Sequence, residues 1–126
     1  MAKAKPKPKS PFTGRWRITS MSAWEEDFLD EEVEAFIEFD YKGWGAFQFG
    51  NVQGQMDCRK TTRDSEPAVE WSWDGNAEMD AAQGRGWAIV NGDELHGMIF
   101  FHGGDDSEFV AKRKCKPTSK PQKEKR

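Results

Sequence analysis

The chain is poor in several residue types that mark whole classes of protein. Its 126 residues include only two cysteines, Cys58 and Cys115, which cannot build the disulfide framework of a small secreted domain. No run approaches the about 18 apolar residues that cross a bilayer. The basic start, MAKAKPKPKS, is not followed by the apolar segment of a secretory signal. We therefore expect a cytoplasmic protein without disulfides that makes no contact with a membrane.

The chain also lacks the signatures of common enzymes and metal sites, because it has no G-x-S-x-G sequence, P-loop or zinc-ligand spacing. Its two histidines, His96 and His102, are six residues apart. That spacing is about 20 Å along a strand, too far for one strand to bring both to one ion. The acidic loop 74–80 lacks the central glycine of a calcium loop, and position twelve is Arg85 instead of glutamate. We expect a protein that is not an enzyme and that needs no cofactor and no metal.

Charge is strongly partitioned along the chain. Residues 1–11 carry four lysines and no acid, and residues 112–126 carry eight basic residues and one acid. The part between them, 12–111, keeps seven of the 19 basic residues and 21 of the 22 acids, a net charge of −14. Both ends are rich in lysine and proline, a composition that is typical of disordered segments. We therefore expect a basic tail at 1–11, one folded domain at 12–113 and a second basic tail at 114–126.

Segments in which apolar and polar residues alternate run through the body of the chain, which is the pattern of half-buried strands. They cover residues 14–21, 33–40, 44–50, 52–60, 68–74, 86–90, 94–101 and 108–113. We expect loops at 61–67 and 75–85, the second with one helical turn, and Asn91-Gly92 predicts the centre of a type I′ hairpin. Because parallel crossovers need a dozen or more residues, the connections predict antiparallel order. The expected fold is all-β, an eight-stranded antiparallel meander that closes into a barrel, with a two-sheet sandwich as the alternative.

One segment breaks the alternation. Residues 22–32, SAWEEDFLDEE, place Trp24, Phe28 and Leu29 at roughly helical spacing. Ser22 followed three residues later by Glu25 matches a capping box at a helix start. We expect one short helix directly after the first strand.

The first strand begins with Gly14-Arg15-Trp16, and the last ends with Lys112 and Arg113. A G-x-W at the head of the first strand, then a short helix, then a meander that ends with a late arginine, resembles the calycin group of lipocalins, fatty-acid-binding proteins and avidins. The resemblance covers the layout of residues 12–113, which is also similar to that of small bacterial proteins of unknown activity. It implies that Trp16 packs at the closed end of the barrel under Arg113, or Lys112, as a barrel-closing pair. Such a pair has a physical basis as a cation–π stack on a desolvated ring.

Large aromatic side chains face the inside of the expected barrel. In a large barrel they would line a ligand cavity, whereas in one this small they can fill the interior, and we expect a filled or nearly filled core. The candidate ligand-binding residues are Trp16, Phe47, Phe49, Trp71, Trp73 and Phe101. Cys58 falls on an apolar strand face that carries no basic residue nearby, which favours a core residue over a nucleophile.

Acidic residues near the expected helix are a candidate surface for a basic partner, including the chain's own tails. They are Glu25, Glu26, Asp27, Asp30 and Glu31. The tails also permit non-specific nucleic-acid contacts, which the net charge of the body opposes. We hypothesise non-catalytic binding of a small apolar or aromatic ligand in the barrel mouth. The alternative is a protein-interaction module that uses the acidic face and exposed aromatics, with the basic tails adding attraction.

Overall fold

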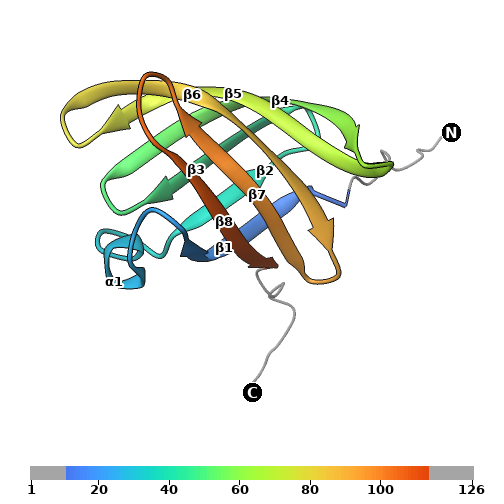
Figure 1. Ribbon diagram of the computed structural model, residues 1–126, viewed down its shortest axis with the longest axis horizontal. Helices are drawn as coiled ribbons and strands as arrows, with labels where there is room; N and C mark the ends of the chain where they lie inside the picture. Colours follow the sequence, from blue (N-terminus) through green and yellow to red (C-terminus); the bar gives the residue numbers. More distant parts are fainter. Residues whose placement is uncertain (1–10, 114–126) are drawn as a thin grey trace, which may run out of the picture.

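The computed structural model describes residues 11–113, which form a β-barrel with one short helix (Figure 1). In chain order the elements are β1 (Gly14–Met21), α1 (Glu26–Leu29), β2 (Phe36–Phe39), β3 (Trp44–Phe49), β4 (Val52–Arg63), β5 (Glu66–Ala77), β6 (Asp80–Asn91), β7 (Glu94–Phe101) and β8 (Asp106–Arg113). The tails expected at the two ends lie outside the described residues, apart from Pro11.

The sheet is closed. Every strand pairs antiparallel with its neighbour in sequence, and β8 returns to pair with β1. That closing pair sets Trp16 opposite Arg113, with a bulge between Ile18 and Ser20. A bulge bends its strand and increases the local twist, which helps a sheet to curl onto itself. The antiparallel barrel of eight strands predicted from the alternation is therefore confirmed, and the sandwich is not formed.

The alternation of side chains separates inside from outside. On β7, Leu95 and Ile99 are buried on the inner face, whereas His96 and Met98 on the outer face are only partly buried. The largest fully buried apolar side chains are Trp16, Phe47, Phe49, Phe109, Ile18, Leu29, Ile37, Met56, Leu95 and Ile99. Full burial of each stabilises the fold by about 1.5–3 kcal/mol relative to exposure. One continuous core therefore fills the barrel between its eight strands.

The α1 region lies at one end of the barrel (Figure 1), and its apolar side chains pack against the core. The Trp24 ring lies 4.9 Å from that of Phe49 and 5.6 Å from that of Phe101, measured between ring centres. Phe28 rests on Gly50, which has a φ of +55° and where a Cβ would come within 2.2 Å of the Phe28 ring. Only glycine suits that position, since it alone adopts this φ freely and leaves room for the ring.

Strands β4, β5 and β6 are longer than the sequence predicted, at 12 residues each. The loop expected at 61–67 is the end of a hairpin, in which Arg63 faces Glu66 and only Asp64 and Ser65 turn. The loop expected at 75–85 is also paired, so the helical turn predicted there is wrong. The physical reason is that polar and glycine-rich residues extend a ladder through backbone hydrogen bonds alone, which an apolar pattern does not reveal.

The hairpin predicted at Asn91-Gly92 is present, but its turn is shifted by one residue and is not of the predicted type I′. Asn91 faces Glu94, so the two turn residues are Gly92 and Asp93. Gly92 has a φ of +68° and Asp93 has no positive φ. Glycine at the first central position is typical of a type II′ turn, the other tight hairpin turn that suits strand twist.

The short helix expected after the first strand is confirmed: α1 takes up four residues of the segment 22–32. The capping box is wrong. The Ser22 hydroxyl accepts a hydrogen bond from the Glu108 amide at 3.0 Å, and the Ser22 amide donates to the Glu108 carbonyl at 3.0 Å. Ser22 therefore joins the start of this segment to β8 instead of starting a helix.

No described segment forms a helix long and apolar enough to cross a membrane.

Candidate functional site

The rings expected to line a cavity meet inside the barrel, where they contact one another. Phe47 lies 5.8 Å from Phe49 and 5.0 Å from Trp73, between ring centres. Phe101 lies 5.2 Å from Trp73 and 6.5 Å from Phe49. These distances and the mostly edge-to-face geometries are those of directly packed aromatic pairs. The protein's own side chains therefore occupy this part of the interior.

Trp71 differs from the other interior tryptophans in its hydrogen bonding. Its ring packs against Phe39 at 5.6 Å between centres, and its side chain is buried. The Nε1–H of Trp71 is the only buried side-chain donor without a partner among the described residues. The indole nitrogens of Trp16 and Trp73 both donate to backbone carbonyl oxygens. A buried donor without a hydrogen-bond partner destabilises a protein by about 1–3 kcal/mol. A molecule that offered an acceptor to the Trp71 N–H would remove this penalty.

Trp16 and Arg113 close the opposite end of the barrel from α1. The guanidinium carbon of Arg113 lies 4.0 Å from the centre of the fully buried Trp16 ring. The same guanidinium donates to the Pro11 carbonyl at 2.6 Å and to the Thr13 carbonyl at 3.2 Å. Arg113 therefore holds the chain that enters β1 against the end of β8.

A groove of about 1030 Å³ crosses the outer face of β4–β7, which is large for a small-molecule site. The strand register arranges its outward side chains in rows that run across the sheet. One row consists of Trp44, Asp57, Ser72, Arg85, Phe100 and Asp106, one residue from each strand from β3 to β8. The two neighbouring rows contribute Arg59, Glu70 and Trp87 on one side and Gln55, Asp74 and Gln83 on the other. The groove is thus built mainly by the three long strands.

Both signs of charge line this groove in near balance. Its arginines are Arg59, Arg63 and Arg85, and its acids are Asp57, Glu70, Asp74 and Asp106. None of these seven makes an ion pair within residues 11–113. The guanidinium carbon of Arg63 lies 3.8 Å from the Trp87 ring centre. The groove therefore presents aromatic surface beside charged groups that can pair with a bound molecule.

Trp44 stands at one end of the groove and is 58% exposed. The Asp40 carboxylate accepts hydrogen bonds from the Lys42 amide at 2.8 Å and the Trp44 amide at 3.0 Å. The Asp40 amide in turn donates to the Trp44 carbonyl at 2.8 Å. These bonds hold the β2–β3 turn in one conformation. An exposed tryptophan on a rigid support is typical of the anchor residues of protein interfaces.

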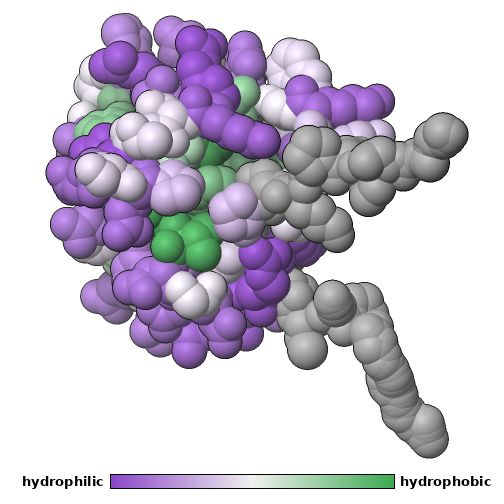
Figure 2. All heavy atoms as spheres, turned by 90° about the vertical axis from the view of Figure 1, so that its right-hand side faces the viewer, coloured by the Kyte–Doolittle hydropathy of each residue, from purple (hydrophilic) through white to green (hydrophobic). Residues whose placement is uncertain are grey.

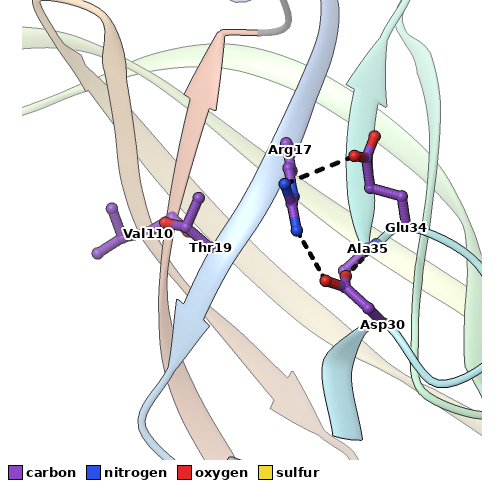
Figure 3. A network of polar contacts seen from close by, with 6 residues as sticks. All are labelled: Arg17, Thr19, Asp30, Glu34, Ala35 and Val110. Atoms are coloured by element: carbon purple, nitrogen blue, oxygen red, sulfur yellow. Dashed lines mark hydrogen bonds and ion pairs between the residues drawn. The ribbon is translucent and has the colours of Figure 1, made fainter. Parts of the chain in front are cut away.

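One of the candidate acids beside α1, Asp30, belongs to a polar network with Arg17 of β1 (Figure 3). Arg17 of β1 donates to Asp30 at 2.7 Å and lies 3.6 Å from Glu34. The other Asp30 oxygen accepts from the Ala35 amide at 2.8 Å. Asp30 therefore has a structural task. The remaining candidates, Glu25, Glu26, Asp27 and Glu31, are exposed and make no side-chain ion pair within the described part of the chain.

The titratable side chains singled out in the sequence do not converge. His96 lies 2.9 Å from Glu94 on the outside of β7, and His102 lies beyond the strand, at the groove. Among residues 11–113, no group of three or more His, Cys, Asp or Glu side chains is placed to hold a metal ion. Burial, with the nearby charges of Asp57 and Asp40, raises the pKa of the Cys58 thiol to about 12. Cys58 is thus an uncharged thiol near neutral pH, as a core residue is expected to be.

The end of the barrel opposite α1 is mostly hydrophilic, with one small hydrophobic area near its centre (Figure 2).

A second hollow, of about 410 Å³, lies beside the β4–β5 turn and the end of β6. Arg63, Trp87 and Ile89 are among its lining residues. Because Arg63 and Trp87 also line the groove, the two hollows adjoin at this stacked pair.

The groove was not predicted from the sequence. Trp87 and Phe100 fall on the outer faces of β6 and β7, and their large apolar side chains are only partly buried there. Aromatic residues on the polar face of an alternating strand were the available signal, since such positions usually hold polar side chains. Their assembly into one groove depends on the register of the six strands β3 to β8, which the pattern of a single strand does not contain.

No protein-family model, curated protein or solved structure matches this chain. The calycin resemblance seen in the sequence therefore gains no support from comparison, although the small antiparallel barrel that it implied is present.

Proposed function

We propose that this protein is a non-catalytic protein-interaction module that binds its partner along the groove on the outer face of β4–β7. The observation that carries the proposal is the contrast between interior and exterior. Inside, Phe47, Phe49 and Trp73 pack against one another. Outside, one groove is lined by exposed Trp44 and by seven charged side chains that make no ion pair with any other residue of 11–113. Binding energy is therefore available on the outer face.

The chemistry of the groove suits a polypeptide partner. Aromatic anchors surrounded by polar groups are the usual composition of protein interfaces. Arg59 and Glu70 face each other across β4 and β5, with Asp57 and Arg85 in the next row. Charges of both signs at fixed positions select a partner with the complementary pattern, because any other partner leaves buried charges unpaired. The net charge of −14 on residues 12–111 adds long-range attraction for basic partners.

We also propose that the barrel is of the calycin type. Three features support this: the Gly14-x-Trp16 start of β1, the position of α1 after β1, and the stack of Arg113 on Trp16. In this arrangement α1 closes one end of the barrel and the stacked pair closes the other.

The experiment that tests the interaction proposal captures partners from extracts of the host with the full chain as bait. We expect a partner that forms a one-to-one complex with this chain. Trp44→Ala should weaken its binding at least about 30-fold, which corresponds to the loss of an anchor worth about 2 kcal/mol. The matched control is Glu26→Gln, an exposed change on α1, which should alter affinity less than about threefold. Equal binding by wild type and by both Trp44→Ala and Arg85→Glu would show that the groove is not the interface.

One observation favours a second candidate function, a small ligand inside the barrel. The buried Nε1–H of Trp71 has no partner among the described residues, and a ligand acceptor would satisfy it. Native and denaturing mass spectra of protein purified from its own host test this candidate. Extra mass that disappears on denaturation, and that falls with Trp71→Phe, is the expected sign of such a ligand. A bare chain under gentle conditions argues against it.

A further inference from the structure

We infer that the Trp44 end of the groove binds an extended lysine- and proline-rich segment, and that in the isolated protein the occupant is this chain's own residues 1–10. We call this surface the Trp44 shelf, and it consists of Asp40, Trp44, Asp57 and Asp74. The inference rests on the proposed function, since it uses the same groove, but it concerns the segment that occupies the groove when no partner is bound.

Charge is the first argument. Asp57 faces Trp44 directly across β3 and β4, and Asp74 lies one row further along on β5. With Asp40, whose carboxylate accepts a hydrogen bond from the Trp44 amide, the shelf contains three carboxylates and one exposed tryptophan. Asp57 and Asp74 make no ion pair within residues 11–113, so their carboxylates are available to an added cation. Residues 1–10 carry four lysines and no acid, so the two surfaces are complementary.

The prolines are the second argument. The start of the chain reads MAKAKPKPKSP, and Pro8-Lys9-Ser10-Pro11 has the P-x-x-P spacing. Such segments favour the polyproline II conformation, which docks on aromatic grooves with little loss of conformational entropy. The Trp44 side chain, more than half exposed, offers a flat apolar surface for a proline ring. The lysines between the prolines are then placed to reach Asp57 and Asp74.

Reach is the third argument. Gly14 faces Phe39, and Phe39 faces Gly45, which is the neighbour of Trp44. The path from the start of β1 to the shelf therefore crosses two strand spacings, about 10 Å. Ten residues in polyproline II span about 31 Å, so the segment reaches the shelf and continues across β4 and β5. Because the connection is short, the local concentration of the segment is in the millimolar range, and weak contacts are sufficient.

The same geometry disfavours the acidic residues beside α1 as the docking site for this segment. They lie at the far end of the barrel, beyond the C-terminal end of β1 (Figure 1). The segment would need to run back along all eight residues of β1, about 26 Å, before making its first ion pair. The shelf lies at the near end and offers an aromatic surface as well as charge.

The test compares two-dimensional amide and indole NMR spectra of the full chain with those of a variant in which Lys3, Lys5, Lys7 and Lys9 are changed to Gln. We expect chemical-shift changes concentrated at the Trp44 indole and the Asp57 and Asp74 amides, several-fold larger than the average elsewhere. Raising the salt concentration to about 0.5 M should produce the same changes, because the Debye length then falls to about 4 Å. Pro6→Ala with Pro8→Ala should reproduce them in part. The matched control changes Lys114, Lys116 and Lys120 to Gln and should leave the Trp44 indole unmoved.

Three results would overturn the inference. Spectra that do not differ at the shelf exclude docking there, and changes centred on Glu26 and Asp27 place the segment beside α1 instead. Shelf shifts that depend on protein concentration identify the segment of a second copy as the occupant. Since these spectra are recorded without any partner, failure here leaves the partner test with Trp44→Ala unaffected.

Discussion

The guanidinium carbon of Arg113 lies 4.0 Å from the centre of the Trp16 ring, at the seam where the last strand of the barrel meets the first. Trp16 is fully buried, so this cation covers a desolvated ring. Two further hydrogen bonds from the same guanidinium reach the Pro11 and Thr13 carbonyl oxygens. Side-chain contacts therefore reinforce the backbone ladder at the point where the sheet closes.

Loss of this contact should weaken the whole barrel. We expect Arg113→Ala to lower the free energy of unfolding by about 2–3 kcal/mol, from the cation–π stack and two backbone hydrogen bonds. Arg113→Lys keeps the charge but not the planar fork of donors, and should lie between wild type and Arg113→Ala. Urea unfolding measures these values. The control is Lys112→Ala, an exposed neighbour whose loss should cost less than about 0.5 kcal/mol. Equal losses for Arg113→Ala and Lys112→Ala would show that the stack contributes nothing.

The fit of Phe28 on Gly50 predicts a large effect from one added carbon. Gly50→Ala adopts an unfavourable φ of +55° and brings its Cβ to 2.2 Å from the Phe28 ring. We expect a loss of about 2–4 kcal/mol by thermal or urea unfolding, from backbone strain and overpacking together. Gly92→Ala is the matched comparison, since its φ is +68° and nothing lies within 4 Å of the added carbon. It should lose only about 1 kcal/mol. Equal losses of unfolding free energy in the two variants would mean that the Phe28 ring moves away from the added carbon without destabilising the protein.

The β4–β5 turn offers a stabilising change. Asp64 and Ser65 have φ values of 52° and 70°. Both values lie in the left-handed region, which residues other than glycine adopt with strain. Ser65→Gly creates Asp-Gly, the preferred pair for a turn with two positive φ angles. We expect the free energy of unfolding to rise by about 0.5–1 kcal/mol, measured by urea unfolding. Ser65→Ala, which keeps the strain, should give no gain, and an equal gain from both would point to a cause other than φ.

Cys58 predicts a loss of stability at alkaline pH. Burial raises the pKa of its thiol to about 12, against about 8.5 for a thiol in the unfolded chain. Between these values the unfolded state releases the proton and the folded state keeps it, so stability falls as pH rises through this window. We expect the ratio of unfolding free energies at pH 10.5 and pH 8 to be higher in Cys58→Ala than in wild type, measured under reducing conditions. A parallel decline in both proteins would contradict the assignment.

Several elements of the fold follow directly from local pattern. β1 and β7 match the predicted ranges residue for residue, because each alternates cleanly and ends at a turn. The hairpin after β6 and the segment that packs Trp24 and Phe28 on the core were also signalled by neighbouring residues. The lengths of β4, β5 and β6 were underestimated, because their ends pair through backbone groups that carry no apolar signature.

The sequence by itself determined the antiparallel barrel and the inward set of aromatic residues. Both depend on a period of two and on short connections, which are local properties of the chain. The tertiary structure alone decided that Trp44, Asp57 and Arg85 share one row of an outer groove, and that the Trp71 N–H finds no partner among residues 11–113. Register and twist across several strands set these positions, and each is a sum of many small contacts between residues far apart in the chain.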